Sequence, residues 1–481
     1  MQVHDLRLVE TGEYIEIRAQ ITGLALREPF PLWYRFPAAL GDAISTDSGN
    51  PFVPGLLLPA MATGDSLELD LPISPRLYNS LRYVQAFYHC LDPSLAVIDV
   101  RAPLRTSASS AAPHVGLFFS LGVDSFYTLL KNTLGHPLTE DAITHLVVVH
   151  GMDIGSYRKT DVFQQMISKT RLAAERVGKN PVDVSTNLKT FMTKLGFGPN
   201  FGTSATMASI GLFLERTFGK HYGAAGLTYA QVEKARGGPS PVLDHLWSTE
   251  RTAFLCDGCE TDRLGKIRFL ARSDVPWDLL RVCWINDIPD YNCGRCSKCL
   301  RTMLCLHIAG LQGKCRTLPS HIDPDRLRSI PLVDSQELTF INEILDERRW
   351  SAANAEIVCA LQEGVSRAST YFTRLDDTKE SIAGLIPQED QFILVDGDDL
   401  RLGLGAGRKV ILFYEPKDDA SAIRELERLR LDGARFVVFW PDVLWWLKYY
   451  TGLNQHLRAS YRCLVDNDNT VMFDLSRSAE P

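Results

Sequence analysis

Two segments near the N-terminus alternate between apolar and polar positions. Residues 15–21 and 67–73 carry an apolar side chain at every second position, which is the period of a half-buried strand. Ser74 and Pro75 then predict the start of a helix, with the serine as its cap. Residues 102–113 are small, polar and bounded by proline, as is typical of a linker. We therefore predict a β-rich N-terminal domain over residues 1–101.

From residue 115 onward, apolar runs alternate with amphipathic segments. The continuous apolar run at 115–119 predicts a buried strand, and further strands are predicted at 145–150, 181–185 and 221–227. Helices are predicted directly after the first strand and at 161–177 and 203–217. Strand–helix alternation at this spacing predicts an α/β domain over residues 114–315, with a parallel, doubly wound sheet that has helices on both faces.

A helical stretch over residues 335–385 precedes a third region with its own pattern. Strands are predicted at 392–395, 409–414, 435–440 and 471–475, and helices at 421–431 and 442–457. This order predicts a small α/β C-terminal domain over residues 385–478.

Composition and charge narrow the class of protein. The chain has 481 residues, with 51 basic and 58 acidic side chains and a net charge of −7, which does not favour a nucleic-acid partner. No apolar run reaches the length of a membrane span, and the N-terminus lacks the pattern of a signal peptide. We expect a soluble cytoplasmic protein with no membrane partner, for which a homodimer is compatible with the sequence.

Seven of the eleven cysteines lie between Cys256 and Cys305. Cys283, Cys293, Cys296 and Cys299 are separated by nine, two and two residues, a spacing at which four thiolates can surround zinc tetrahedrally. Gly294 permits the tight turn that this spacing needs. An iron–sulfur cluster is the alternative, because the spacing does not fix the metal.

Residues Ser120–Ser125 (Ser-Leu-Gly-Val-Asp-Ser) lie between a predicted buried strand and a helix. The start of a helix offers unpaired N–H groups and the positive end of the dipole, so an anion binds favourably there. Gly122 permits close approach of the backbone. The alternative is a plain helix cap made by Ser120 or Asp124.

This Ser-x-Gly-x-Asp-Ser pattern resembles the pyrophosphate loop (PP-loop) of the N-type ATP pyrophosphatases, which usually have Ser-Gly-Gly-x-Asp-Ser. Leu121 replaces the second glycine, and leucine would strain the loop if that position requires a positive φ. The loop followed by the four cysteines resembles 7-cyano-7-deazaguanine synthase and its relatives. This resemblance covers about residues 115–311.

The resemblance implies an adenine nucleotide alpha hydrolase-like fold and an ATP-dependent ligase that uses magnesium and structural zinc. The enzyme would adenylate a carboxylate or carbonyl oxygen for attack by a nitrogen nucleophile. The residues implied to bind ATP are Ser120, Leu121, Gly122, Val123, Asp124 and Ser125, with His150 and Gly151 at the adenine. Catalytic roles fall on Asp124, which would assist magnesium, on Ser125 and on Arg263, which stands where a lysine is usual. Zinc would be bound by Cys283, Cys293, Cys296 and Cys299.

Two alternatives come from other features of the sequence. Cys256 and Cys259 form a second Cys-x2-Cys motif, which in a sulfur transferase would carry a persulfide. Leu121 could instead have inactivated the loop, leaving a non-catalytic nucleotide-binding scaffold protein. The acceptor would be a small-molecule carboxylate or a protein terminus, and the sequence does not distinguish between them.

Overall fold

The computed structural model divides the chain into two compact units. The first consists of Met1–Leu332 and Thr339–Gly364, and the second of Val333–Leu338 and Val365–Pro481. The residues that the structure describes are 1–26, 28–106, 112–135, 141–152, 160–197, 201–234, 238–285, 291–332, 335–346, 350, 354–395 and 409–476.

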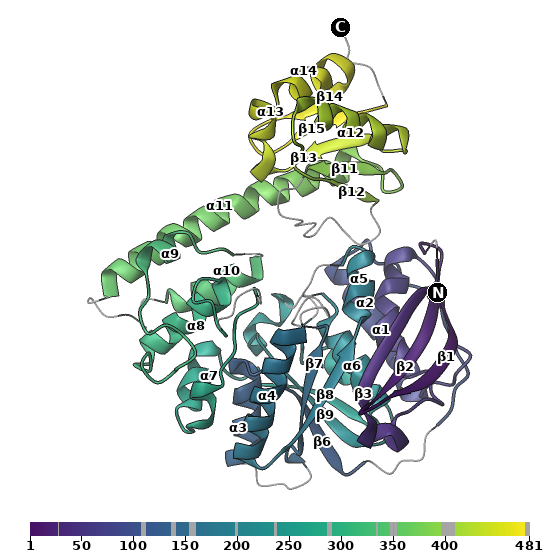
Figure 1. Cartoon of the computed structure of the whole chain (residues 1–481), viewed down its shortest axis with the longest axis vertical. Coiled ribbons are helices and arrows are strands. Elements are labelled where there is room, and N and C mark those ends of the chain that lie inside the picture. The colour runs from purple at the N-terminus through teal and green to yellow at the C-terminus, as the bar shows by residue number, and fades with distance from the viewer. Residues whose placement is uncertain are drawn as a thin grey trace. The chain divides into compact units, whose positions relative to one another are not determined.

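The first unit is built on a mixed sheet of ten strands among the described residues (Figure 1). In chain order they are β1 (Gln2–Thr11), β2 (Tyr14–Thr22), β3 (Phe30–Pro37), β4 (Leu67–Glu68), β5 (Val100–Arg101), β6 (His114–Phe118), β7 (His145–His150), β8 (Asn180–Thr186), β9 (Phe218–Ala224) and β10 (Ala253–Asp257). Their order across the sheet is β10-β9-β6-β7-β8-β3-β2-β1-β4-β5. The first five in this order run parallel to one another. Four of them, β6–β9, correspond to the predicted parallel strands, whereas β10 was not predicted.

The N-terminal strands continue the parallel part of the sheet. β3 pairs antiparallel with β8 through Tyr34↔Thr186 and Arg35↔Ser185, and β2 and β1 follow antiparallel. The residues predicted as a β-rich domain and those predicted as an α/β domain therefore share one sheet and one compact unit. Of the segment predicted as a linker, residues 107–111 lie outside the described residues.

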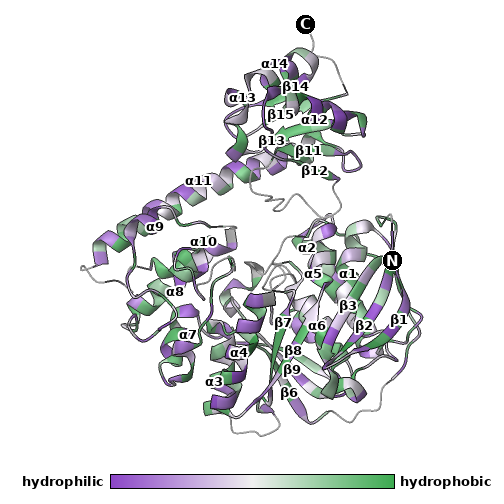
Figure 2. Ribbon diagram, viewed as in Figure 1, coloured by the Kyte–Doolittle hydropathy of each residue, from purple (hydrophilic) through white to green (hydrophobic). Residues whose placement is uncertain are grey.

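The helices of the first unit connect these strands or follow them. They are α1 (Phe52–Thr63), α2 (Pro75–Leu91), α3 (Val123–Leu134), α4 (Thr160–Val177), α5 (Leu188–Lys194), α6 (Thr203–Phe213), α7 (Arg263–Leu270), α8 (Ser297–Ile308) and α9 (Pro324–Arg328); α10 (Ser335–Ile344) and α11 (Ala355–Leu385) each include residues of both units. In Figure 2 the strand β7 is largely green, whereas α11 mixes purple and green. Buried strands are apolar on both faces, while an exposed helix keeps a polar side.

Helices pack on both faces of the sheet at β6. Gly116 of β6 is paired with His221 of β9, whose ring stacks on Phe254, and a Cβ on Gly211 of α6 would meet both rings. On the other face, Phe126 of α3 packs edge-on against Phe119, with 5.0 Å between ring centroids. The loop between β6 and α3 therefore lies at the carboxyl end of a central strand.

The structure corrects two predictions in the N-terminal region. The strand predicted at 67–73 is a ladder of only two residues, because the chain bends at Asp70 and Leu71. Helix α1 was not predicted, since its sequence FVPGLLLPAMAT is apolar on all sides and contains Pro54 and Pro59. By contrast, Ser74 caps α2 as predicted, accepting a hydrogen bond from the Leu77 N–H.

The second unit contains a smaller sheet of order β12-β11-β13-β15-β14. Its elements are β11 (Phe392–Val395), β12 (Val410–Phe413), α12 (Asp419–Leu431), β13 (Phe436–Phe439), α13 (Trp446–Tyr449), α14 (Thr451–Ser460), β14 (Arg462–Asp466) and β15 (Val471–Asp474). The four predicted strands are present, β14 was not predicted, and the helix predicted at 442–457 is divided near Tyr450. Across the described parts of both units, no helix has the length and apolarity to cross a membrane.

Candidate functional site

The Ser120–Ser125 loop connects β6 to α3, as predicted. Gly122 precedes the first residue of α3 with extended backbone angles, and no side chain caps the helix there. Ser125 donates a hydrogen bond from its hydroxyl to the Gly122 carbonyl, and the Ser120 hydroxyl lies 3.5 Å from the Ser125 hydroxyl. The helix N-terminus is therefore not closed by a capping side chain and can offer its N–H groups to an anion.

Leu121 has the backbone conformation that the usual glycine would adopt easily. Its φ is +63°, in the left-handed region where a leucine costs roughly 1–2 kcal/mol. Its side chain is fully buried, and its carbonyl accepts a hydrogen bond of 2.9 Å from the Arg281 N–H. Burial and this hydrogen bond both favour the strained conformation.

The backbone strain predicts an unusual order of stability at position 121. We expect the free energy of unfolding of Leu121→Gly to be about 1 kcal/mol higher than that of Leu121→Ala, so the glycine variant should be the more stable. In an ordinary loop conformation alanine would be the more stable of the two. Denaturant unfolding of the two variants measures the difference, and an alanine variant as stable as the glycine variant would contradict a left-handed conformation at this position.

Two cations converge on Asp124 in the first turn of α3. Arg263 Nη2 lies 2.8 Å from Asp124 Oδ2, and Lys266 Nζ lies 2.9 Å from Asp124 Oδ1. Burial alone would raise the pKa of Asp124, but the charges of Arg263 and Lys266 outweigh it and hold this pKa well below its usual range. Arg301 of α8 lowers it further.

Lys266 was not identified from the sequence. Its side chain is 1% exposed, and Nζ also donates to the Ala225 carbonyl after β9. Lys266 follows Arg263 by three residues on α7, so both side chains lie on one face of the helix. The three-residue spacing of Arg263 and Lys266 is visible in the sequence. It indicates a shared role for the two cations only once Asp124 is known to face α7.

A cavity of about 140 Å³ adjoins the loop. Its lining is Phe118, Phe119, Ser120, Asp124, Ser125, Val147, Val148, Val149, Met152, Met166, Thr203, Met207, Ala224 and Pro239. Leu121 is not among these residues, so its side chain does not fill this cavity. Polar groups of the loop thus meet an apolar space at the carboxyl ends of β6, β7 and β9, where ligands bind in open α/β sheets.

His150 and Gly151, the residues expected at the adenine, lie at the end of β7 but do not line this cavity. The His150 ring is buried and stacks on Phe163 of α4, with 4.3 Å between the ring centroids. A Cβ on Gly151 would approach the Thr186 carbonyl oxygen to 2.0 Å, so close packing requires glycine there. Their neighbours Val149 and Met152 do line the cavity.

The arrangement of Asp124 does not fit a direct role in binding magnesium. Mg²⁺ requires carboxylate or other oxygen ligands in near-octahedral geometry, but both oxygens of Asp124 are paired with cations. Asp124 therefore positions Arg263 and Lys266 beside the loop.

The four predicted cysteine ligands come together in space. The sulfur atoms of Cys283, Cys293, Cys296 and Cys299 all lie within 4.8 Å of one another, and Cys293 Sγ is 3.9 Å from Cys299 Sγ. Around a zinc ion with bonds of about 2.3 Å, tetrahedral sulfurs would be about 3.8 Å apart. The quartet therefore fits zinc.

Local structure explains this convergence. Gly294 has a φ of +66°, and a Cβ there would lie 2.7 Å from Pro319, which confirms the predicted tight turn. The backbone N–H groups of Arg295 and Cys296 point at Cys293 Sγ, at 3.4 and 3.3 Å. Cys296 is the N-cap residue of helix α8.

The cysteine centre is connected to the loop through residues 280–283. The Asn292 side chain accepts hydrogen bonds from the Val282 and Cys283 N–H groups and donates to the Leu280 carbonyl. Between these residues, the Arg281 N–H donates to the Leu121 carbonyl. A metal at the quartet would therefore hold the segment that supports the loop from behind.

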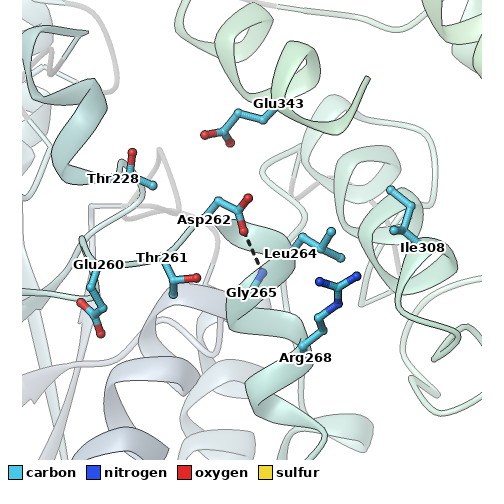
Figure 3. A pocket seen from close by; sticks show the side chains of 9 residues that line it. All are labelled: Thr228, Glu260, Thr261, Asp262, Leu264, Gly265, Arg268, Ile308 and Glu343. Atoms are coloured by element: carbon cyan, nitrogen blue, oxygen red, sulfur yellow. Dashed lines mark hydrogen bonds between the residues drawn. The ribbon is translucent and has the colours of Figure 1, made fainter. Parts of the chain in front are cut away.

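A second cavity, of about 580 Å³, lies beside the N-terminus of α7. Figure 3 shows three carboxylates around it, those of Glu260, Asp262 and Glu343, with Arg268 on α7. Asp262 also caps α7 by accepting a hydrogen bond from the Gly265 N–H at 2.8 Å. Because three carboxylates and one cation would repel a triphosphate, the smaller cavity at the loop is the better candidate site for a nucleotide.

The second Cys-x2-Cys motif lies at the end of β10. Cys256 Sγ and Cys259 Sγ are 3.6 Å apart, and Gly258 between them has a φ of +94°. Neither cysteine belongs to the metal quartet.

Comparisons with known proteins give no relative: no family model, no curated protein and no solved structure matches the chain.

Proposed function

We propose that the first unit is an ATP-dependent ligase of the PP-loop type that forms AMP and pyrophosphate. It would adenylate a carboxylate or carbonyl oxygen, as 7-cyano-7-deazaguanine synthase-like proteins do. The observation that carries this proposal is the convergence of Arg263 and Lys266 on Asp124 at the open N-terminus of α3. Two cations and a helix N-terminus around one carboxylate leave positive charge for a polyphosphate.

In this proposal, the loop N–H groups and the hydroxyls of Ser120 and Ser125 bind the pyrophosphate end of ATP. A substrate oxygen attacks the α-phosphorus, pyrophosphate leaves, and a nitrogen nucleophile then displaces AMP. Arg263 and Lys266 stabilise the negative charge that develops on the leaving pyrophosphate. The apolar lining from β7 and α6 excludes water beside the reacting groups.

The same proposal assigns the sheet of the first unit to the doubly wound, adenine nucleotide alpha hydrolase type. A doubly wound sheet of the adenine nucleotide alpha hydrolase type would carry helices on both faces, and α3 and α6 meet that requirement at β6. Zinc at the cysteine quartet would have a structural role, holding residues 280–283 against the loop.

The test is calorimetry with ATP, followed by a pyrophosphate-release assay across a panel of carboxylic acids with ammonium present. We expect ATP to bind and at least one acid to release pyrophosphate. Ser125→Ala should lower that release by about 100-fold, whereas the exposed Ser168→Ala on α4 should leave it unchanged. Binding without pyrophosphate release would favour the scaffold alternative. Release that requires a sulfur donor and is lost in Cys256→Ala would favour sulfur transfer.

A further inference from the structure

Cys256 and Cys259 form a close pair of thiols at the carboxyl end of β10. Cys256 lies in this strand and is partly exposed, whereas Cys259 is 2% exposed. Their sulfur atoms are 3.6 Å apart, and Gly258 turns the chain between them with a φ of +94°. A disulfide requires a sulfur–sulfur distance of about 2.05 Å, so the two sulfurs need to approach only a little further to form one.

The residues around this pair are fixed against α3. Asp257 Oδ1 lies 2.6 Å from Lys131 Nζ, and Glu260 accepts a hydrogen bond of 2.7 Å from the Tyr127 hydroxyl. Both of these partners lie on α3. The backbone is also held, because the Ala225 N–H donates to the Asp257 carbonyl at 2.8 Å. The turn therefore keeps the two thiols close together without a covalent bond between them.

A buried cation lies beside the pair. A Cβ on Gly258 would lie 3.6 Å from Lys266 Nζ, and Lys266 is 1% exposed. The hydrogen bond from the Cys256 thiol and the charge of Lys266 lower the pKa of Cys259 against the effect of burial, and the same hydrogen bond raises the pKa of Cys256. The two sulfurs thus share one proton beside a cation. Such surroundings favour the thiolate, which is the reactive form of cysteine.

We propose that Cys256 and Cys259 are a redox-active dithiol that low-molecular-weight disulfides oxidise to a reversible internal disulfide, and that Lys266 stabilises its reduced form. In the first step the more accessible sulfur, that of Cys256, attacks one sulfur of the small disulfide as a thiolate. The other sulfur of the small disulfide leaves with the electron pair. In the second step Cys259 attacks Cys256 Sγ and expels the remaining small thiolate.

The two steps balance. The dithiol loses two electrons and two protons, and the small disulfide becomes two thiols. Neither step uses ATP, so this inference does not depend on the proposed function. It also differs from the sulfur-transfer alternative, in which Cys256 would gain a sulfur atom instead of bonding to Cys259.

The test uses the full-length protein and its tryptic peptide Thr252–Arg263, which contains both cysteines and no other. The protein is equilibrated at neutral pH in glutathione buffers with an increasing share of glutathione disulfide. It is then quenched with acid, alkylated with N-ethylmaleimide and digested, and mass spectrometry measures each form of the peptide. We expect the doubly alkylated peptide to give way to the internal disulfide, and dithiothreitol to reverse the change.

Two serine variants separate the steps. Cys259→Ser lacks the second nucleophile, so it should retain glutathione on Cys256 as a trapped mixed disulfide. Cys256→Ser leaves only the buried thiol, so it should carry about tenfold less glutathione than Cys259→Ser. Equal amounts of glutathione on both variants, or none on either, would overturn the proposed order of attack.

Lys266→Met removes the cation beside the pair, which should make the internal disulfide about tenfold more stable relative to glutathione, the effect of one pKa unit on the thiolate. Lys314→Met removes an exposed cation that pairs with Asp274 and should leave this equilibrium unchanged. An equilibrium that Lys266→Met does not shift would overturn the role of Lys266. In the unmodified protein, a dithiol that persists in the most oxidising buffer, mixed disulfides alone, or a peptide with an added sulfur atom would overturn the redox-active pair itself.

Discussion

Lys266→Met is expected to lower ATP-dependent pyrophosphate release by about 100-fold or more, the usual effect of removing one preorganised group that stabilises developing charge. Lys266 Nζ is fixed between Asp124 Oδ1 and the Ala225 carbonyl and is almost fully buried. Methionine fills a similar volume without the charge, so the cavity should keep its shape. Single-turnover pyrophosphate release and calorimetry with ATP measure the loss.

Lys131→Met is the matched control for this variant. Lys131 lies on α3 close to the same region, but its ion pairs are with Asp257 and Glu260, not with Asp124. We expect Lys131→Met to retain pyrophosphate release within a few-fold of the unmodified protein. If Lys266→Met retained full release, or if both variants lost it equally, Lys266 would have no specific role at the loop.

Cys296→Ser is expected to abolish metal binding and to lower the melting temperature of the first unit by about 10 °C or more, because the binding energy of a structural zinc is also folding energy. Cys296 is fully buried at the start of α8, and its sulfur lies within 4.8 Å of the other three. Its loss should release residues 280–283 and so weaken the support of Leu121. Elemental analysis and differential scanning calorimetry measure the two effects.

Cys305→Ser separates metal loss from the loss of a buried thiol. Cys305 is also fully buried on α8 but does not belong to the quartet, so this variant should keep one metal ion per chain. Elemental analysis also identifies the metal, since iron with visible absorbance would indicate a cluster in place of zinc. Full metal content in Cys296→Ser would contradict the assigned quartet.

The parallel part of the fold could be predicted because β6 and β7 contain continuous apolar runs and helical segments alternate with the strands. β6 and β7 are buried over nearly their whole length, and a parallel sheet covered by helices is the usual arrangement for such strands between amphipathic helices. Where this signal was absent, prediction failed. Helix α1 is apolar on all sides and has no helical period, and β3 was not predicted although its alternate residues are buried.

The candidate site was predictable where its residues are neighbours in the chain. The Ser120–Ser125 loop and the cysteine quartet can each be recognised from the spacing of their residues in the sequence. The structure brings the four sulfurs together as predicted. Lys266 gave no such signal, because its partner Asp124 is 142 residues away in the sequence. Only the fold brings Lys266 to Asp124.

The pairing of β3 with β8 limits how the molecule can be divided. A shortened protein that began after the predicted linker would keep the loop and the cysteine quartet but would leave the backbone groups at Ser185 and Thr186 without β3. The exposed edge of β8 could then pair with strands of other chains, which leads to aggregation. The N-terminal strands therefore protect the edge of the parallel half of the sheet, and transplanting that half into another protein would require carrying β1–β3 with it.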